Sequence, residues 1–225
     1  MNNDDYKSII LSWDQEVYVS DYADTEDFTN GISGEIFAEG EDENRELAGN
    51  FKIYYIDVSR AIDSGISAFD VFDSHSQGLY DYYSELFNGE EFCEKLQECF
   101  NYEIYGSNLL IIERLEIVPK YRGKNWGLKI LRELIERFSY GAGIVAIKPF
   151  PLQHECIEDS SSEKKKWFEG MEFSKLTQDK KIGTNKLIEH YGKLGFQRVE
   201  NIEYMVLSTC LKMPSIADKC IPHAN

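Results

Sequence analysis

Long apolar runs are missing from this chain of 225 residues. No stretch approaches the roughly 18 apolar residues that a membrane-spanning helix needs, so we expect no membrane partner. The first residues, Met1-Asn2-Asn3-Asp4-Asp5, are acidic and lack the basic segment that opens a secretory signal peptide. We therefore expect the protein to be cytoplasmic.

Cysteine and histidine are few and scattered. The five cysteines, an odd number, include no Cys-x-x-Cys pair, and their spacing outlines no disulfide framework. Reduced, mostly buried thiols are therefore expected. The four histidines, His75, His154, His190 and His223, lack the short spacing that zinc ligands have. We expect no metal site.

Basic residues are rare in the first half. Residues 1–110 hold 25 Asp and Glu against 5 Lys and Arg, and residues 111–225 hold 15 against 19, for a net charge of −16. An acidic half would repel nucleic acid and attract cations. The alternative interpretation, that the acidic surface only keeps the protein soluble, has equal weight. The 14 Tyr and 13 Phe indicate a folded globular protein.

The most informative stretch is Ile117-Val118-Pro119-Lys120-Tyr121-Arg122-Gly123-Lys124-Asn125-Trp126-Gly127. It follows an apolar, strand-like run at 109–115 and leads into a helix-like run at 128–138. The first N–H groups of a helix have no intrahelical partner, and the helix dipole places partial positive charge there. Basic residues at this end oppose the dipole, which favours an anionic ligand over an ordinary basic turn. The stretch therefore predicts a phosphate-binding loop.

The pattern of apolar residues predicts the other elements. Strands are expected at 9–11, 17–19, 31–38, 47–58, 108–118, 144–147, 196–199 and 204–211. Helices are expected at 79–101, with a break at Asn88-Gly89, at 127–138, and at 184–194, with Thr184 as N-cap and Gly195 as the stop. The polar segment 149–181 is expected to be partly an exposed loop, with 167–173 packed back.

The order strand, anion loop, helix, strand, long connection, helix, strand resembles the core of the GNAT N-acetyltransferase superfamily across residues 108–211. The superfamily's acyl-CoA signature is Arg/Gln-x-x-Gly-x-Gly/Ala after a strand that ends in Val-x-Pro, and residues 117–119 and 122–127 are similar to it. Its later motif, Tyr-x-x-Leu-Gly-Phe, is present as Tyr191-Gly192-Lys193-Leu194-Gly195-Phe196. Because both motifs occur in order around the strand at 144–147, the resemblance is specific.

The resemblance implies an α+β (α/β) fold, the GNAT acyl-CoA N-acyltransferase fold, with a central mixed, mostly antiparallel sheet flanked by helices. It implies a single domain over 1–225, in which 1–107 shapes the acceptor side and 108–211 binds acetyl-CoA. The first half matches the superfamily only loosely, and the connection from Phe150 to Lys181 is longer than its minimum. Such domains often pair, so a homodimer is one expected state.

The resemblance also implies roles for single residues. The cosubstrate acetyl-CoA would be bound by Ile117, Val118, Arg122, Gly123, Lys124, Asn125, Trp126, Gly127 and Asn185, with its pyrophosphate on the N–H groups of 123–127. Tyr191 would give a proton to the leaving thiolate, and a backbone N–H near Ile117 or Val118 would hold the carbonyl oxygen. The base would be Glu113 or Glu116. These lie three residues apart, so only one faces the site unless a bulge intervenes.

For several of these residues the sequence also allows an interpretation without a role in binding or catalysis. Tyr191 is in line with Leu187 and Leu194, as a core aromatic would be, and Trp126 either covers the cofactor or packs in the core. The alternative for both glutamates is that they are solvated residues of the strand. Asn125 stands where the superfamily has glycine, but asparagine tolerates a positive φ best among the other residues, so the loop is expected to persist. Asn185 stands one place after the superfamily's usual asparagine, a position that Thr184 occupies here.

We expect an acetyl-CoA-dependent N-acetyltransferase. It would transfer the acetyl group to a primary amine of a cationic acceptor, a small molecule or a protein, by direct attack in a ternary complex. The alternative is a GNAT-fold module with weak or no catalysis that senses CoA or binds a protein, which Asn125 and the loosely matching first half suggest. An enzyme that acetylates charged tRNA ranks last, because the overall acidity argues against nucleic acid.

Overall fold

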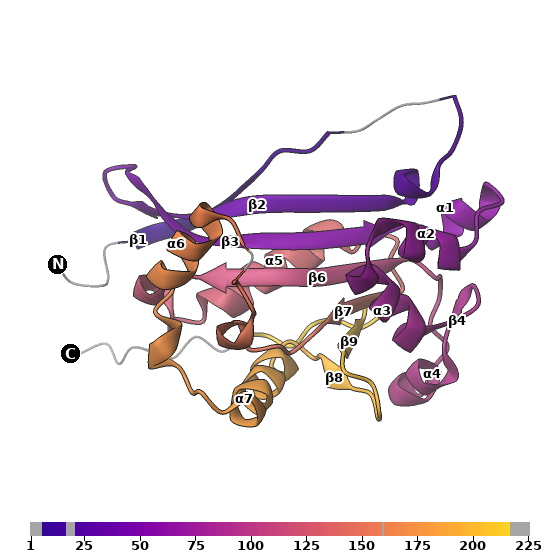
Figure 1. Ribbon diagram of the computed structural model, residues 1–225. Coiled ribbons are helices and arrows are strands. Elements are labelled where there is room, and N and C mark those ends of the chain that lie inside the picture. Colours follow the sequence, from indigo (N-terminus) through magenta and orange to yellow (C-terminus); the bar gives the residue numbers. More distant parts are fainter. Residues whose placement is uncertain (1–5, 17–20, 159, 217–225) are drawn as a thin grey trace.

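A seven-stranded sheet forms the centre of the computed structural model, which describes residues 6–16, 21–158 and 160–216 (Figure 1). In spatial order the strands are β1 (Tyr6–Trp13), β2 (Thr29–Gly40), β3 (Arg45–Ile56), β6 (Leu109–Ile117), β7 (Ile144–Ile147), β9 (Met205–Ser208) and β8 (Gln197–Arg198). All neighbouring pairs are antiparallel except β6 and β7, which are parallel. The prediction of a mixed, mostly antiparallel sheet flanked by helices is confirmed, and the architecture is α+β.

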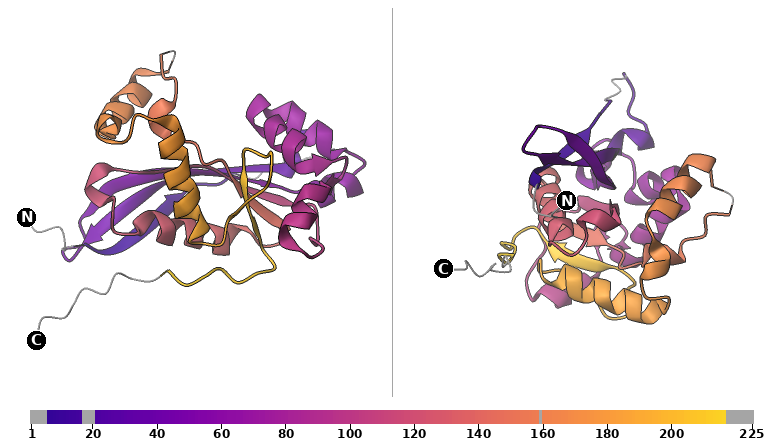
Figure 2. Two further views of the ribbon diagram at one scale, coloured as in Figure 1. Left: turned by 90° about the horizontal axis from the view of Figure 1, so that it is seen from below. Right: turned by 90° about the vertical axis from the view of Figure 1, so that its left-hand side faces the viewer.

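Helices cover both faces of this sheet (Figure 2). One face is covered at one end by α1 (Val58–Asp63), α2 (Ala68–His75), α3 (Gln77–Leu86) and α4 (Glu94–Phe100), and at the other end by α6 (Ser162–Gly170). The opposite face is covered by α5 (Trp126–Phe138). The last helix, α7 (Lys180–Gly192), runs from the side of α6 toward the N-terminus of α5. A hairpin of β4 (Phe87–Asn88) and β5 (Glu91–Phe92) and four 3-10 turns (Thr25–Phe28, Pro119–Tyr121, Leu152–His154, Phe173–Lys175) complete the described elements.

Two apolar clusters, one on each face of the sheet, form the core. Phe72, Leu79 and Leu96 pack on one face, and Leu131 and Leu134 pack on the other. The strands β6 and β7 contribute to both clusters, because every residue from 109 to 112 and from 144 to 147 is buried. Parallel strands covered on both faces read as continuous apolar runs, which is why these two strands were predictable.

The predicted helix at 79–101 is two helices in the structure. The break at Asn88-Gly89 is confirmed, since a β4–β5 hairpin separates α3 from α4 there and Gly89 has a φ of 69°. The prediction that Thr184 caps the last helix is wrong. The helix α7 begins four residues earlier, at Lys180, and its N-cap is Asp179, whose side chain accepts from the N–H of Ile182. Gly195 does follow the helix in a left-handed conformation, with a φ of 96°.

Two further segments differ from the predictions, and one predicted strand cannot be compared with the structure. Residues 61–75, for which the sequence predicts no element, contain part of α1 and all of α2. Part of the predicted loop at 149–181 is α6, whose N-cap Ser161 accepts from Lys164, and the return at 167–173 is confirmed by buried Met171 and Phe173. The strand predicted at 17–19 lies outside the described residues.

The strands β6 and β7 separate after four paired positions. Their pairing runs from Leu109 opposite Ile144 to Ile112 opposite Ile147. After this point β6 continues to Ile117 along β3 alone, while the chain after β7 leaves the sheet through Pro149 and Pro151. Half of β6 therefore has no strand beside it on this edge among the described residues.

A β-bulge lies at the point of separation. In the β3–β6 pairing, Ile53 is opposite Ile112 and Lys52 is opposite Arg114, so Glu113 has no partner position on β3. An extra residue in one strand changes which side chains share a face. The bulge therefore sets the direction of both candidate glutamates.

Candidate functional site

The loop before α5 has the backbone geometry that its sequence predicts. Gly123 has a φ of 82°, and Asn125 has a φ of 60° and a ψ of 10° at the N-cap position. The prediction that asparagine takes the left-handed conformation here is confirmed. Asn125 makes no side-chain cap hydrogen bond, so the first N–H groups of α5 keep their capacity to bind an anion.

We expect Asn125→Val to lower the free energy of unfolding by about 1–2 kcal/mol, because a β-branched residue is strained at positive φ. Asn125→Gly should be as stable as the parent or slightly more stable. Denaturant midpoints measure both effects, and Asn185→Val, an exposed position inside α7, is the matched control. Equal midpoints for the valine variant and the parent would contradict the role of this conformation.

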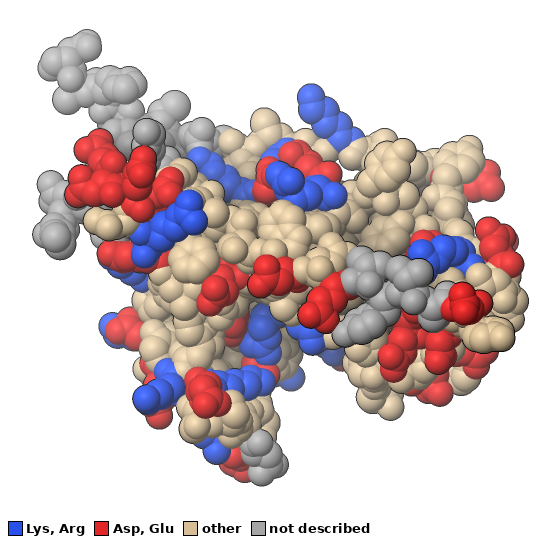
Figure 3. All heavy atoms as spheres, turned by 90° about the horizontal axis from the view of Figure 1, so that it is seen from above, with Lys and Arg blue, Asp and Glu red and all other residues tan. Residues whose placement is uncertain are grey.

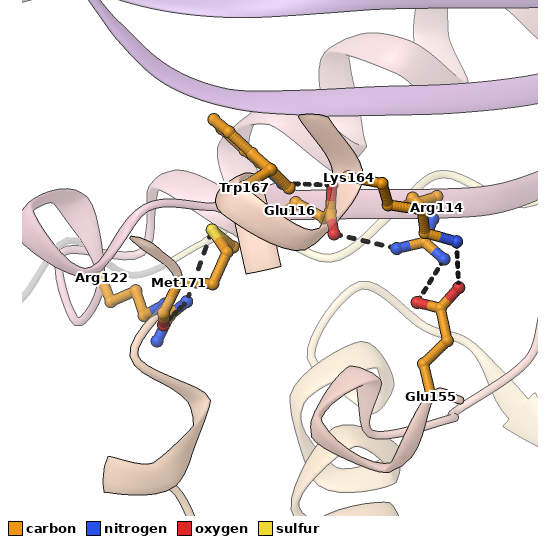
Figure 4. A network of polar contacts seen from close by, with 7 residues as sticks. All are labelled: Arg114, Glu116, Arg122, Glu155, Lys164, Trp167 and Met171. Atoms are coloured by element: carbon orange, nitrogen blue, oxygen red, sulfur yellow. Dashed lines mark hydrogen bonds and ion pairs between the residues drawn. The ribbon is translucent and has the colours of Figure 1, made fainter. Parts of the chain in front are cut away.

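Arg122 ties the loop to two neighbouring segments. Its Nε donates to the carbonyl oxygen of Ile117 at 2.7 Å. Its Nη2 donates to the carbonyl oxygen of Met171 at 2.9 Å (Figure 4). The guanidinium also lies 5.6 Å from the ring of Phe173. Burial lowers the pKa of Arg122 below its ordinary value. Arg122 therefore joins the end of β6 to the segment that follows α6.

Trp126 and Gly127, the first two residues of α5, lie on different sides of this helix. Gly127 is next to α7, since a Cβ at this position would lie 3.8 Å from Nε2 of His190. Trp126 instead lines a groove between α5 and β1 together with Trp13 and Lys129, and the Lys129 ammonium lies 5.4 Å from its ring. Burial, with a contribution from Lys193, lowers the pKa of His190. The α7 side of the helix N-terminus is therefore formed by Gly127 and a histidine whose neutral form is favoured.

A first cavity, of about 390 Å³, lies between α7 and Arg122, and residues 123–127 of the loop are not part of its wall. Its wall includes Arg122, four side chains of α7 and the connection that follows β7; the α7 residues with side chains in this wall are Lys186, Leu187, His190 and Tyr191. Asn185 is exposed and is not part of this wall. The volume is within the range of roughly 300–1,000 Å³ that ligand sites have.

A second cavity, of about 160 Å³, lies on the other side of Tyr191. It is lined by Asp81 and Tyr82 of α3, by Glu113, and by Tyr204, the residue before β9. The two cavities share Leu115, Phe150, Leu152 and Tyr191. They therefore meet where β6 and β7 have separated.

Tyr191 stands at this junction. Burial raises the pKa of its hydroxyl to about 12, so the phenol is protonated at neutral pH. No hydrogen-bond partner of this hydroxyl exists among the residues that the structure describes. The ring of Tyr191 also lies 6.2 Å from that of Phe196, so it packs against another residue of the Tyr-x-x-Leu-Gly-Phe motif. Tyr191 therefore lines both cavities with a side chain whose hydroxyl has no partner among the described residues.

The bulge directs both glutamates to the same face of the sheet. Glu116 is buried, with 6% of its surface exposed, and accepts from Arg114 at 2.9 Å and from Nε1 of Trp167 at 3.0 Å (Figure 4). Glu113 is exposed and makes no ion pair or hydrogen bond within the described part of the chain. The two glutamates thus differ in their availability for chemistry.

Arg114 connects Glu116 to a second carboxylate. Its Nη2 donates to Glu155 at 2.6 Å, and Lys164 of α6 donates to the same carboxylate at 2.8 Å. Burial raises the pKa of Glu155, but the hydrogen bonds and charges of Arg114 and Lys164 outweigh it, so the net pKa is lowered. This network, together with the Trp167 bond, fastens α6 to β6.

The sequence did not indicate the residues that α3 and β9 contribute. Asp81 and Tyr82 belong to a helix whose apolar spacing was interpreted only as core packing, and Tyr204 precedes a strand far along the chain. The rings of Tyr82 and Tyr204 stack with their centroids 4.0 Å apart. Burial, and after it the charge of Glu113, raises the pKa of Tyr82 well above its ordinary value.

Acidic side chains are not confined to the second cavity. Figure 3 shows that on the face seen from above Asp and Glu gather toward both ends of the molecule. Charge alone therefore does not identify a binding site on this protein, and the geometry of the cavities carries more weight.

No protein-family model matches the chain, and no curated protein or solved structure matches it significantly. Among the described residues, no three His, Cys, Asp or Glu side chains form a group that could hold a metal ion. None of the described helices is long and apolar enough to cross a membrane.

Proposed function

We propose that this protein is an acetyl-CoA-dependent N-acetyltransferase of the GNAT type, acting on a primary amine. The observation that carries the proposal is the meeting of two cavities at Tyr191, where β6 and β7 separate. One cavity is lined by Arg122, the first residue of the predicted phosphate-binding loop, and the other is lined by two carboxylates. Such an arrangement suits two substrates that must meet at one point in a ternary complex.

The residues beside the first cavity suit the cosubstrate. The N–H groups of 123–127 would bind its pyrophosphate, with Lys124 nearby in the loop. The edge of β6 beyond Ile112, beside which the described part of the chain places no strand, would pair with the amides of the pantetheine arm. Bound there, acetyl-CoA supplies the activated acetyl group.

The backbone of β6 favours one donor for the carbonyl oxygen over the other. The N–H of Val118 donates to the carbonyl oxygen of Ala48 at 2.9 Å. Consecutive N–H groups along a strand point to opposite edges, so the N–H of Ile117 points to the free edge. Ile117, the other residue expected for this role, is therefore the proposed donor.

Glu113 and Tyr191 provide the proton transfers. Glu113 takes one proton from the ammonium of the acceptor, and the free amine nitrogen bonds to the acyl carbon as the carbon–sulfur bond breaks. The Tyr191 hydroxyl donates to the leaving sulfur, and the second proton of the amine replaces the one it gives. The products are an amide, a thiol and one proton released to solvent through Glu113.

Isothermal titration with acetyl-CoA tests the proposal. We expect a Kd between about 1 µM and 1 mM, the range in which most enzymes bind substrates. ATP serves as a control polyanion and should bind at least about tenfold more weakly, a difference of about 1.4 kcal/mol. Absence of binding at millimolar acetyl-CoA would rule out both the enzyme and the CoA-sensing alternative.

One observation favours the alternative of a module that binds CoA without catalysis. The guanidinium of Arg122, a residue of the motif, already bonds to Ile117 and Met171. Release of CoA in the presence of a panel of primary amines separates the two functions. Turnover supports the enzyme, and binding without turnover supports the module.

A further inference from the structure

The second cavity is narrow. Its volume of about 160 Å³ is below the range of roughly 300–1,000 Å³ that sites for drug-sized ligands have. It is also less than half the volume of the first cavity, about 390 Å³. Only one end of an acceptor fits inside it.

The position of the junction restricts that end further. The amine nitrogen must reach the wall that the two cavities share, which is formed by Leu115, Phe150, Leu152 and Tyr191. In a ring-borne amine, the bulk of the ring lies one bond from the nitrogen and would have to fit inside the small second cavity. At the end of an unbranched chain, the nitrogen reaches the junction ahead of the remaining atoms.

The uncompensated charge of the cavity is negative. Lys148 is paired with Glu203 at 2.6 Å, and Arg114 is paired with Glu116 at 2.9 Å. Among the described residues, the carboxylate of Asp81 accepts from the neutral amide of Gln77 at 2.8 Å and forms no ion pair. Asp81 and Glu113 therefore face the cavity with charges that an ammonium would balance.

Aromatic rings complete the wall. Tyr82, Tyr204, Tyr191 and Phe150 line the cavity. The ammonium groups of Lys148 and Lys180 already lie over Tyr204 and Phe150, at 5.5 and 5.1 Å from the ring centres. The rings therefore offer apolar contact to the alkyl stem of an amine rather than a free face to its ammonium. The cavity thus combines two carboxylates with an aromatic wall.

We infer that the acceptor is a primary ammonium at the end of an unbranched alkyl chain and not an amine carried directly on a ring or a branched carbon. The inference rests on the proposed function, because it assigns the acceptor of the same reaction. The chain end is either that of a free diamine or that of a lysine side chain, which share this chemistry.

Gly78 allows the shape of the cavity to be changed without disturbing the fold. It lies in α3, lines the cavity, and a Cβ there would meet nothing closer than Oγ of Ser76 at 3.9 Å. A leucine at 78 would extend into the cavity, and helix propensity favours it over glycine. Gly170→Leu, in α6 where a Cβ meets nothing within 4 Å, is the matched control.

The experiment compares amines with the full-length protein. CoA release is measured with n-pentylamine, cadaverine, Nα-acetyl-lysine methylamide, cyclohexylamine and glucosamine. We expect kcat/KM to be at least about tenfold higher for the unbranched amines than for the ring-borne ones. Gly78→Leu should reduce kcat/KM for n-pentylamine at least about tenfold and that for ethylamine less, whereas Gly170→Leu should change neither. The ratio of cadaverine to the lysine derivative distinguishes the two sources of the chain.

Direct binding makes the result independent of turnover. Titrations of n-pentylamine and cyclohexylamine into the CoA-saturated protein should show about tenfold tighter binding of n-pentylamine. Equal binding or equal turnover of the two amines, or no binding of either, would overturn the inference while leaving acetyl-CoA binding intact. Failure of the proposed function would instead appear as absent acetyl-CoA binding.

Discussion

Replacing Tyr191 with phenylalanine is expected to slow CoA release about 10²–10⁴-fold, the usual contribution of a general acid. The substitution removes only the hydroxyl of a residue that lines both cavities. Because burial raises its pKa to about 12, the parent hydroxyl remains a donor across the neutral range. The rate is measured from thiol release at saturating acetyl-CoA with an unbranched amine.

Acetyl-CoA affinity and stability should not change in Tyr191→Phe. The hydroxyl makes no hydrogen bond within the described residues, so the free energy of unfolding should stay within about 0.5 kcal/mol. Tyr140→Phe is the control, since Tyr140 is 94% exposed and lies away from both cavities. An unchanged rate in Tyr191→Phe would assign the tyrosine to core packing, the alternative that the sequence left open.

The second half of the fold was predictable because its signals are local. β7 and the centre of β6 are buried on both faces and so read as continuous apolar runs, and α5 shows a clear amphipathic period. In the first half, α1 and α2 are short helices of six and eight residues. Their N-caps are Asp57 and Ser67, but no long periodic pattern of apolar residues follows either cap. Tertiary packing against the sheet, which a local pattern does not contain, stabilises such short helices.

The candidate site was predictable only where a backbone conformation restricts which residue type can occupy a position. Asn125 shows this, because few residues other than glycine accept its φ of 60°. The partners of Glu116 and Arg122 were not predictable, since Trp167 and Met171 reach them from α6 and the residue after it, about 50 positions away in the chain. The bulge at Glu113 likewise depends on the register with β3.

Glu113→Gln and Glu116→Gln are expected to have opposite effects on catalysis and stability. Glu113→Gln should lower kcat about 10²–10⁴-fold, because it removes the proposed base, and should leave stability within about 0.5 kcal/mol. Glu116→Gln should lower the free energy of unfolding by about 1–3 kcal/mol. The two oxygens of Glu116 accept from two donors, Arg114 and Trp167, whereas glutamine offers one oxygen and an NH₂ group that would face the other donor.

The two variants match each other as controls, since each removes one charge from the same strand and keeps the side-chain size. The rate of CoA release at saturating substrates gives kcat, and denaturant titration gives the free energy of unfolding. If Glu116→Gln lost catalysis at unchanged stability, the base would be Glu116, and its bonds to Arg114 and Trp167 would have to open during turnover. If Glu113→Gln kept full activity across pH 6–9, the exposed carboxylate at the bulge would serve only to attract the acceptor. The bulge would then matter for shape and charge, and the amine would lose its proton to water.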